Sequence, residues 1–239
     1  MVLPFFYSSE IKTDTSHFVL DEETSKHIVQ VLRMQNAEQL QLTDGKGNLF
    51  TAEITDNNRK RCAVSIIQTA SHQRPTINIS IAISLIKNAS RFEWFLEKAT
   101  ELGVTEIIPL ICTRTEKQHF REDRMKGVLI SAMLQSQQVW LPILHEPKKF
   151  AELIMKANQQ QKFIAHCEDE NNKIQLTAQL LNLPAGEASK LILIGPEGDF
   201  TKEEINHALQ NNFVPVALGN TRLRTETAGI AAATLLCLV

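Results

Sequence analysis

The sequence predicts a protein of the α/β class, with a small β-barrel over residues 1–72 and a mostly parallel sheet over residues 73–239. Up to residue 72, apolar residues alternate with polar ones, and this period of two is typical of half-buried strands. After Pro75, β-branched runs alternate with amphipathic stretches, an order typical of a parallel sheet with helices on both faces. The 239 residues are 43% hydrophobic and 22% charged, which fits one large or two modest domains and excludes a disordered or fibrous chain.

The first 72 residues are expected to form strands and one short helix. The alternating residues predict three strands, at residues 40–42, 50–54 and 62–66. Turn-forming residues at 44–47 and 56–58 separate these strands. Residues 27–32 break the alternation, because their apolar side chains fall at helical spacing after the acidic residues 21–23. A short helix is therefore expected at this position.

Five strands are expected after residue 75, at residues 77–86, 104–112, 163–167, 191–194 and 213–218. Ser90 and Glu93 have the spacing of a capping box with Ser90 at the cap, which predicts the start of a helix. Gly103 is expected to end this helix, because glycine readily adopts the left-handed conformation. Apolar residues within 125–133 predict a further amphipathic helix.

One unusual loop follows the apolar strand expected at residues 191–194. In an open parallel sheet, ligands bind beyond the carboxyl ends of the strands, so such loops are candidate sites. Two glycines flank a Pro-Glu pair at residues 195–198, which lets the backbone approach a ligand closely. Thr201 and Glu204 then have capping-box spacing. The alternative is a tight strand-to-helix turn, since an isolated carboxylate such as Glu197 is more often solvated or capping than catalytic.

A second loop, at residues 219–224, leads into a segment rich in Ala and Leu that is expected to be helical. Arg224 and Glu226 lie beside two threonines at the start of this helix, where backbone N–H groups favour anions. The alternative is structural: Thr225 or Thr227 caps the helix, and Arg224 pairs with a nearby carboxylate.

The remaining patterns exclude several classes of protein. GxGxxG, GxxxxGK(S/T), GxSxG and HExxH are all absent, so neither the usual dinucleotide fingerprint nor a P-loop, nucleophile elbow or metalloprotease helix is present. The four cysteines are far apart, so no metal site or redox pair is expected. No apolar run approaches the ~18 residues of a membrane span and residues 1–20 lack a signal-peptide pattern, so we expect a cytoplasmic protein with no membrane partner. A net charge of −2 excludes a globally basic nucleic-acid-binding coat but allows a local basic surface.

Residues 193–198, followed by residues 218–219 and 223–228, resemble the ribosomal RNA small subunit methyltransferase E family, a member of the SPOUT class of knotted methyltransferases. Residues 31–34 match the family's amino-terminal domain and residues 98–104 match its first long helix, so the resemblance extends over the whole chain. It implies a PUA-like β-barrel that helps to hold RNA, followed by a SPOUT-type parallel sheet whose carboxyl end is threaded through a trefoil knot.

The resemblance also implies an activity and its partners. The family works as a homodimer and transfers a methyl group from S-adenosylmethionine to N3 of a uridine in the 16S rRNA of the small ribosomal subunit. Two alternatives to this function remain: a non-catalytic RNA-binding or ribosome-assembly factor with the same fold, and a knotted methyltransferase that acts on tRNA.

The sequence departs from the family's pattern in two places. Where relatives commonly carry Glu-Gln-Ser/Cys-Gly-Arg before the central Pro142, this chain has the residues 134–138, Leu-Gln-Ser-Gln-Gln. Thr221 stands where the family has an arginine, and Arg222 occupies an aliphatic position. These changes remove cationic contacts that would hold RNA or shape a dimer interface, and the first of them favours the non-catalytic alternative.

Candidate site residues follow from the loops and from the resemblance. When uridine N3 loses its proton, negative charge develops on the ring carbonyls, and Arg224 is the candidate to stabilise this charge. Glu226 is the candidate to orient Arg224 or to accept the proton. The expected cofactor-binding residues are Leu193, Ile194, Gly195, Pro196, Glu197, Gly198, Leu218, Gly219, Leu223, Arg224, Thr225 and His166, the last of which could equally be a buried structural histidine. The expected RNA-binding residues are Arg33, Lys60, Arg61, Lys87 and Arg91.

Overall fold

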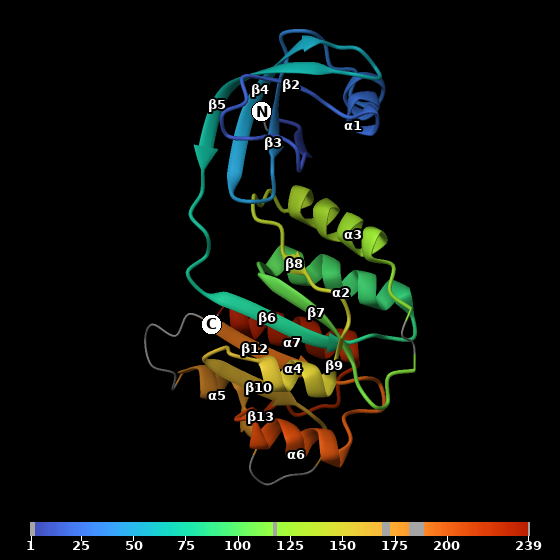
Figure 1. Ribbon diagram of the computed structural model, residues 1–239, viewed down its shortest axis with the longest axis vertical. Coiled ribbons are helices and arrows are strands. Elements are labelled where there is room, and N and C mark those ends of the chain that lie inside the picture. The colour runs from blue at the N-terminus through green and yellow to red at the C-terminus, as the bar shows by residue number, and fades with distance from the viewer. Residues whose placement is uncertain (1–2, 117–118, 169–172, 182–188, 239) are drawn as a thin grey trace. The chain divides into compact units, whose positions relative to one another are not determined.

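The computed structural model describes residues 3–116, 119–168, 173–181 and 189–238 (Figure 1). The chain forms two compact units, one of residues 1–74 with 133–141 and the other of residues 75–132 with 142–239. The segment 133–141, which the expected division at residue 72 assigns to the second part, packs in the first unit. There the backbone N–H of Gly47 donates to the carbonyl oxygen of Val139 over 2.9 Å.

The first unit is built on a five-stranded sheet in the order β1-β3-β4-β5-β2. Its strands are β1 Phe5–Tyr7, β2 His17–Val19, β3 Gln39–Thr43, β4 Asn48–Asp56 and β5 Ala63–Ser71. β4 pairs antiparallel with β3 and β5, whereas β1 pairs parallel with β3. The three strands expected from the alternation are confirmed, and their inward-facing residues, such as Leu40, Leu42 and Phe50, are fully buried in one apolar core.

The short helix of the first unit is confirmed, but it changes type along its length. α1 Glu22–Lys26 begins after Asp21, whose carboxylate accepts from the backbone N–H of Thr24 over 2.8 Å. The next turn, η1 His27–Val31, is a π-helix, in which each N–H bonds five residues back rather than four. Leu32 makes this bond to His27, and Arg33 then leaves the helix with a φ of 58°.

The second unit contains an eight-stranded sheet in which every strand pair is parallel, as the sequence predicts. Its strands are β6 Asn78–Ser84, β7 Glu106–Ile111, β8 Ile143–Leu144, β9 Lys148–Lys149, β10 Gln161–Ala165, β11 Ile174–Gln175, β12 Ser189–Ile194 and β13 Val214–Ala217. The order is β11-β13-β10-β12-β6-β7-β8, and β9 also pairs with β7. β12, β10 and β13 are therefore neighbours, although long segments separate them in the sequence.

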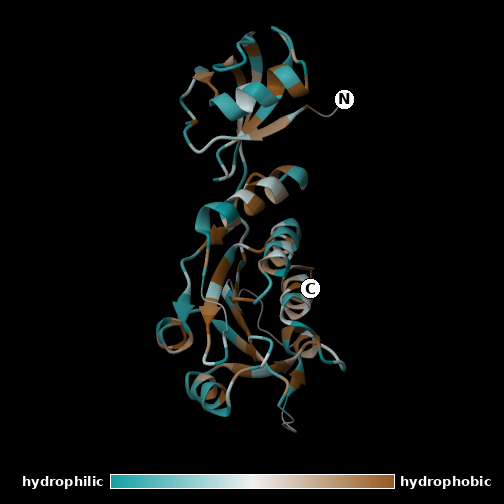
Figure 2. Ribbon diagram, turned by 90° about the vertical axis from the view of Figure 1, so that its right-hand side faces the viewer, coloured by the Kyte–Doolittle hydropathy of each residue, from teal (hydrophilic) through white to brown (hydrophobic). Residues whose placement is uncertain are grey.

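Helices cover both faces of this sheet. They are α2 Ala89–Leu102, α3 Glu122–Gln135, α4 Phe150–Lys156, α5 Leu176–Leu181, α6 Lys202–Gln210 and α7 Thr225–Leu238. α2 packs against α7, and α7 packs against β6 and β12, while α4 and α6 pack against each other. Figure 2 shows the hydrophobic colour concentrated on the strands between these helices. None of the helices in the described ranges has the length and apolar character that a bilayer span requires.

The helix boundaries test the predicted caps. Thr201 caps α6 in a complete capping box with Glu204, as predicted. Gly103 ends α2 in the left-handed conformation, with a φ of 91°, also as predicted. The prediction of Ser90 as a cap is wrong, because α2 begins at Ala89 and the side chain of Asn88 accepts from the N–H of Ser90 over 3.0 Å. An asparagine two residues earlier satisfies the free N–H group, so a cap at Ser90 is not needed.

Candidate functional site

Two adjoining recesses lie where β10, β12 and β13 end. The first recess, of about 390 Å³, is lined by Arg91, Ala165, Cys167, Ile194–Glu197, Asp199, Arg222–Thr225 and Ala228. The second recess, of about 380 Å³, is lined by Ala165–Cys167, Lys173, Val216–Leu223 and Ala228. The two share Ala165, Cys167, Arg222, Leu223 and Ala228, so they lie side by side, and together they are called the hollow. Carboxyl ends of parallel strands are where open α/β sheets bind ligands.

The loop that follows β12, residues 195–201 (the first loop), is fastened to three neighbouring loops. Asp199, at a φ of 64°, accepts from the N–H of Cys167 over 2.7 Å. Glu197 accepts from the N–H of Lys87 over 3.2 Å. The Arg114 guanidinium donates to the carbonyl oxygens of Gly198 over 2.6 Å and Phe200 over 3.4 Å. The first loop therefore has its shape before any ligand is present.

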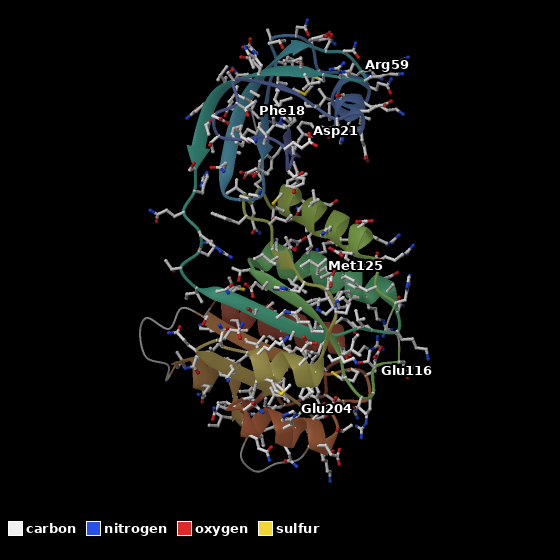
Figure 3. The ribbon with its side chains drawn as sticks, viewed as in Figure 1. Phe18, Asp21, Arg59, Glu116, Met125 and Glu204 are labelled. Atoms are coloured by element: carbon white, nitrogen blue, oxygen red, sulfur yellow. The ribbon has the colours of Figure 1, made fainter. Side chains whose placement is uncertain are left out.

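Glu204 fastens the far end of the first loop to the loop that follows β7. This carboxylate, labelled in Figure 3, is 9% exposed and lies in the first turn of α6. One of its oxygens accepts from the N–H of Thr113 over 2.8 Å, and the other accepts from the N–H of Thr201 over 2.9 Å. The capping box was predictable from spacing, but the partner Thr113 lies 91 residues away and has no local signal.

Two glycines in these loops are required for different reasons. A Cβ atom at Gly195 would lie 3.1 Å from the ring of Phe200, a contact so tight that the ring would have to shift, so the close approach of this side chain favours glycine. Gly219 has open space around it but a φ of +140°, which residues with a side chain rarely adopt. Packing therefore explains the glycine in the first loop, and backbone conformation explains the glycine after β13.

The loop that follows β13, residues 218–224 (the second loop), is held by fewer side chains. In the described part of the chain, one side chain from outside reaches it: Gln175 donates to the Asn220 side chain over 3.2 Å. At its end, the carbonyl oxygen of Arg224 accepts from the N–H of Ala228 over 2.8 Å, the first hydrogen bond of α7. Arg222 and Arg224 are exposed and line the first recess.

The two predicted catalytic residues lie near each other, but they have different partners. Arg224 lines the first recess, whereas Glu226 is buried beneath it at 5% exposure. Oε1 of Glu226 lies 3.6 Å from Nε of Arg91, an arginine that was expected to bind RNA and that lines the first recess. The structure thus pairs Glu226 with Arg91, and the expected orientation of Arg224 by Glu226 has no supporting contact among the described residues.

The predicted cofactor-binding residues are brought together almost completely. Six of them line the first recess: Ile194, Gly195, Pro196, Glu197, Arg224 and Thr225. Three line the second recess, His166, Leu218 and Gly219, and Leu223 lines both. Leu193 lies instead in the sheet core with no exposed surface, and Gly198 packs against Arg114. Sequence reasoning missed Cys167, Asp199 and Arg222, which line the hollow beside the predicted motifs.

The predicted RNA-binding residues lie on both units. Arg33, Lys60 and Arg61 are exposed on the first unit. Their loops are joined there, because the N–H and the side-chain amide of Asn57 donate to Asn36 over 2.9 Å and to Gln35 over 3.3 Å. On the second unit, exposed Lys87 forms an ion pair of 2.9 Å with Glu116, and Arg91 lines the first recess.

The cysteines provide no nucleophile in the core. Burial raises the pKa of the Cys112 thiol, and burial raises the pKa of Cys237 to about 11, so both thiols stay protonated at neutral pH. Cys167, at the meeting point of the two recesses, is exposed. In the described ranges, no cluster of three or more His, Cys, Asp or Glu side chains could hold a metal ion.

Comparison with known proteins identifies the family. A family model described as an RNA methyltransferase domain matches residues 72–237, and an RNA methyltransferase PUA domain matches residues 20–67. The chain is 31% identical over 207 residues to ribosomal RNA small subunit methyltransferase E of Synechocystis, an alignment that covers 84% of this chain and 66% of that protein.

Solved structures agree with this match over nearly the whole chain. The crystal structure of a probable rRNA-methyltransferase from Porphyromonas gingivalis has a TM-score of 0.88 at 36% identity, covering 98% of this chain and 97% of that one. Ribosomal RNA small subunit methyltransferase E of Neisseria gonorrhoeae, bound to S-adenosyl methionine, has a TM-score of 0.85 at 28% identity, with coverage of 98% and 96%. The chain therefore belongs to the ribosomal RNA small subunit methyltransferase E family.

Proposed function

We propose that this protein transfers the methyl group of S-adenosylmethionine to N3 of a uridine in the 16S rRNA of the small ribosomal subunit. The observation that carries the proposal is the hollow at the ends of β10, β12 and β13, whose two adjoining recesses are lined by the two family motifs. The Neisseria relative of the same fold is bound to S-adenosyl methionine. A ribosomal substrate also places the reaction in the cytoplasm.

The hollow fits S-adenosylmethionine in size and in chemistry. Each recess alone lies in the range of about 300–1,000 Å³ that is usual for small-molecule sites. Backbone groups and apolar side chains line the hollow at residues 194–196, 218–219 and 223, and they suit an uncharged adenine and ribose. The cofactor would supply an electrophilic methyl carbon on a positively charged sulfur atom. These segments would hold it at the hollow.

The chain's own residues would orient the acceptor and stabilise its charge. Holding two reactants in line lowers the barrier by about 7–11 kcal/mol. N3 lies on the Watson–Crick edge, so the target uridine must be unpaired or flipped at a cost of a few kcal/mol. Arg224, exposed at the first recess, would stabilise the negative charge that develops on the uracil carbonyls as N3 loses its proton.

The path of the chain supports a trefoil knot in the second unit. β13 lies on one side of β10, while α7, which follows it directly, packs on β12 and β6 on the other side. The second loop makes this return beside the first loop, since both line the first recess. We propose that α7 passes through the chain at this point, as in other members of the SPOUT class.

The outer side of α7 supports a homodimer. Ile230 and Leu235 are only half-buried, and Leu238 is 68% exposed, although the helix is predominantly apolar. Trp94 of α2, the helix that packs against α7, is 46% exposed. A second copy of the chain would cover such a surface. Light scattering should give the mass of a dimer, and Leu238→Glu should shift it towards the monomer.

Phosphate contacts are proposed for exposed cations on the two units: Arg33, Lys60, Arg61 and Lys87. Phosphate contacts make affinity fall steeply with salt, and each lost contact reduces the slope of log K against log salt by about one. Arg33→Ala should therefore weaken binding to all RNA sequences alike and flatten the salt dependence. Binding that does not change with salt would exclude the contact.

The residues that favour the non-catalytic alternative do not belong to the unit that contains the hollow. Residues 134–138 belong to the first unit, and Gln138 donates to Ser136 within the same segment over 3.0 Å. The departure at Thr221 lies in the lining of the second recess, where Arg222 restores a guanidinium one position later. Neither departure removes a predicted catalytic residue, so the enzyme is favoured.

The test is methylation of unmodified ribosomes. Small subunits from a strain that lacks the gene are incubated with the protein and S-adenosylmethionine, and 16S rRNA is analysed by mass spectrometry. We expect one new 3-methyluridine. Cofactor binding without any methyl transfer would favour the RNA-binding factor, and methylated tRNA would favour the tRNA enzyme. Either result would overturn the proposal.

A further inference from the structure

Arg91 and Glu226 form an unusual ion pair where α2 and α7 begin. Arg91 lies in the first turn of α2 and lines the first recess, and its side chain is 41% exposed. Glu226 lies in the first turn of α7, and its side chain is only 7% exposed. Nε of Arg91 lies 3.6 Å from Oε1 of Glu226, and only the arginine of this pair lines the recess.

Both partners leave hydrogen-bonding groups unused. Oε2 of Glu226 is buried and accepts no hydrogen bond from the residues that the structure describes. Within the same residues, the two terminal nitrogen atoms of Arg91 have no acceptor, although a guanidinium carries five N–H donors. A buried polar atom without a partner costs about 1–3 kcal/mol. The pair is therefore poorly arranged for stability alone.

A second pair on the same helix shows what a stabilising arrangement looks like. Arg124 of α3 donates two hydrogen bonds to Glu93 of α2, from Nε over 2.5 Å and from Nη2 over 2.8 Å. This pair is bidentate and lies away from both recesses. The Arg91 pair has a single contact at a longer distance, and the terminal N–H groups of Arg91 donate to no described residue. The contrast indicates that Arg91 is available to a ligand.

The charge of the first recess selects the class of that ligand. Arg91, Arg222 and Arg224 all line it, whereas its two carboxylates, Glu197 and Asp199, already accept hydrogen bonds from backbone N–H groups. Among the described residues, Arg222 and Arg224 form no ion pair with a carboxylate, so their guanidinium groups would attract an anion. The anion in this reaction is the uracil ring after N3 has given its proton to solvent water, so the cationic side of the recess suits the methyl acceptor.

We propose that Arg91 is a second catalytic residue, which binds the carbonyl edge of the acceptor uracil, and that Glu226 is the positioning residue that holds it. The assignment rests on the proposed methyl transfer to uridine. It separates Arg91 from the phosphate-binding residues. It also gives Glu226 a role that its burial permits, because its side chain is only 7% exposed and its Oε1 lies beside Arg91.

The decisive variants are Arg91→Ala and Arg91→Lys, with Arg124→Ala as the matched control. The single-turnover rate is measured with small subunits at saturating S-adenosylmethionine, and the Kd of the cofactor is measured by calorimetry. Loss of one donor to a developing oxyanion costs about 10²–10³ in rate. We expect a loss of that size for Arg91→Ala. Arg91→Lys should recover part of the rate, because it keeps the positive charge but loses the planar set of N–H donors. Arg124→Ala should lose no rate.

Glu226→Gln tests the positioning role. It keeps the shape of the side chain but removes the charge that holds Arg91, so we expect a rate about tenfold lower with little change in KM for RNA. Residues that act through one another are not additive. The double variant Arg91→Ala/Glu226→Gln should therefore be no slower than Arg91→Ala alone. If the rate loss of the double variant equals the product of the two single losses, Glu226 acts independently of Arg91, and its assignment as a positioning residue is overturned.

Several outcomes would overturn the role of Arg91. These are a wild-type rate for Arg91→Ala, a loss confined to cofactor Kd, and a salt slope reduced by about one with an unchanged rate, which would mark a phosphate contact. If Arg91→Ala melts at a much lower temperature than Arg124→Ala, the rate of Arg91→Lys tests the role of Arg91 instead. A rate of Arg91→Lys equal to that of the wild type would overturn the role. If the wild-type protein itself forms no 3-methyluridine, the proposed function fails, and this assignment fails with it.

Discussion

The two loops that line the hollow are built in different ways. The first loop, residues 195–201, is held by Arg114, Lys87, Cys167 and the buried Glu204, which come from other loops or from the next helix. The second loop, residues 218–224, is exposed over much of its length and receives one outside hydrogen bond among the described residues, from Gln175. One wall of the site is thus held by many contacts that form on folding, whereas the other has few such contacts.

This difference predicts how substitutions act. Changes to the supports of the first loop should lower the stability of the fold and weaken cofactor binding together. Changes in the second loop should alter binding or rate and leave the free energy of unfolding nearly unchanged, because few contacts are lost. Ordering the second loop on binding costs conformational entropy, so its rigidity contributes directly to affinity.

The largest effect is expected at the end of the second loop. Arg224→Ala should reduce the methylation rate about 10²–10³-fold, because a cation at the first recess no longer stabilises the developing negative charge. Cofactor Kd and the free energy of unfolding should change little. Single-turnover kinetics measures the methylation rate, and calorimetry measures the cofactor Kd. Arg121→Ala, at an exposed position, is the control. Methylation at the wild-type rate would show that Arg224 has another role.

The next effect is expected at the support of the first loop. Glu204→Ala removes the capping box of α6, worth about 1 kcal/mol, and leaves the N–H of Thr113 without its partner, which costs about 1–3 kcal/mol more. Urea unfolding should show the sum, and cofactor Kd should rise in parallel. The adjacent exposed Glu203→Ala is the control. Unchanged stability in Glu204→Ala would mean that the first loop does not depend on this carboxylate.

The same contrast explains how much the sequence could predict. The parallel sheet, the Thr201–Glu204 capping box and the Gly103 helix end follow from period and spacing, and the structure has all three. The two helix ends are local, and the parallel sheet was predictable because each of its longer strands and the helices between them has a local period. The two- and three-residue strands, such as β1 and β8, are too short to show a period and were not predicted.

The missed parts of the site are those formed by residues far apart in the chain. Arg114 donates to Gly198, which lies 84 positions away in the sequence. Arg91 meets Glu226 because tertiary packing brings the first turns of α2 and α7 together. No local pattern records such a contact. The motifs showed which loops form the hollow, but the side chains that hold those loops in place could be found only in the folded protein.

A smaller effect is expected at Gly219 of the second loop. Its φ of +140° is strained for any residue with a side chain, so Gly219→Ala should cost about 1–3 kcal/mol in the conformation that lines the second recess. If this loop is ordered mainly by the ligand, the cost should appear as a higher cofactor Kd. The melting temperature without ligand should hardly move. A fall in melting temperature equal to that of Glu204→Ala would show that the second loop is also formed by folding.

The smallest effect is expected at Arg114, which supports the first loop from an exposed position. Its guanidinium donates to the carbonyl oxygens of Gly198 and Phe200, but water can replace an exposed donor, so Arg114→Ala should cost about 1 kcal/mol. That loss should raise cofactor Kd about fivefold and lower unfolding free energy by a similar amount. Arg114→Lys has a single ammonium group in place of the planar guanidinium, so its cofactor Kd and unfolding free energy should lie between those of the wild type and those of Arg114→Ala. If the cofactor Kd rises while the free energy of unfolding stays the same, the first loop contributes to binding but not to stability. The first loop would then behave as the second loop is expected to, and the contrast between them would be wrong.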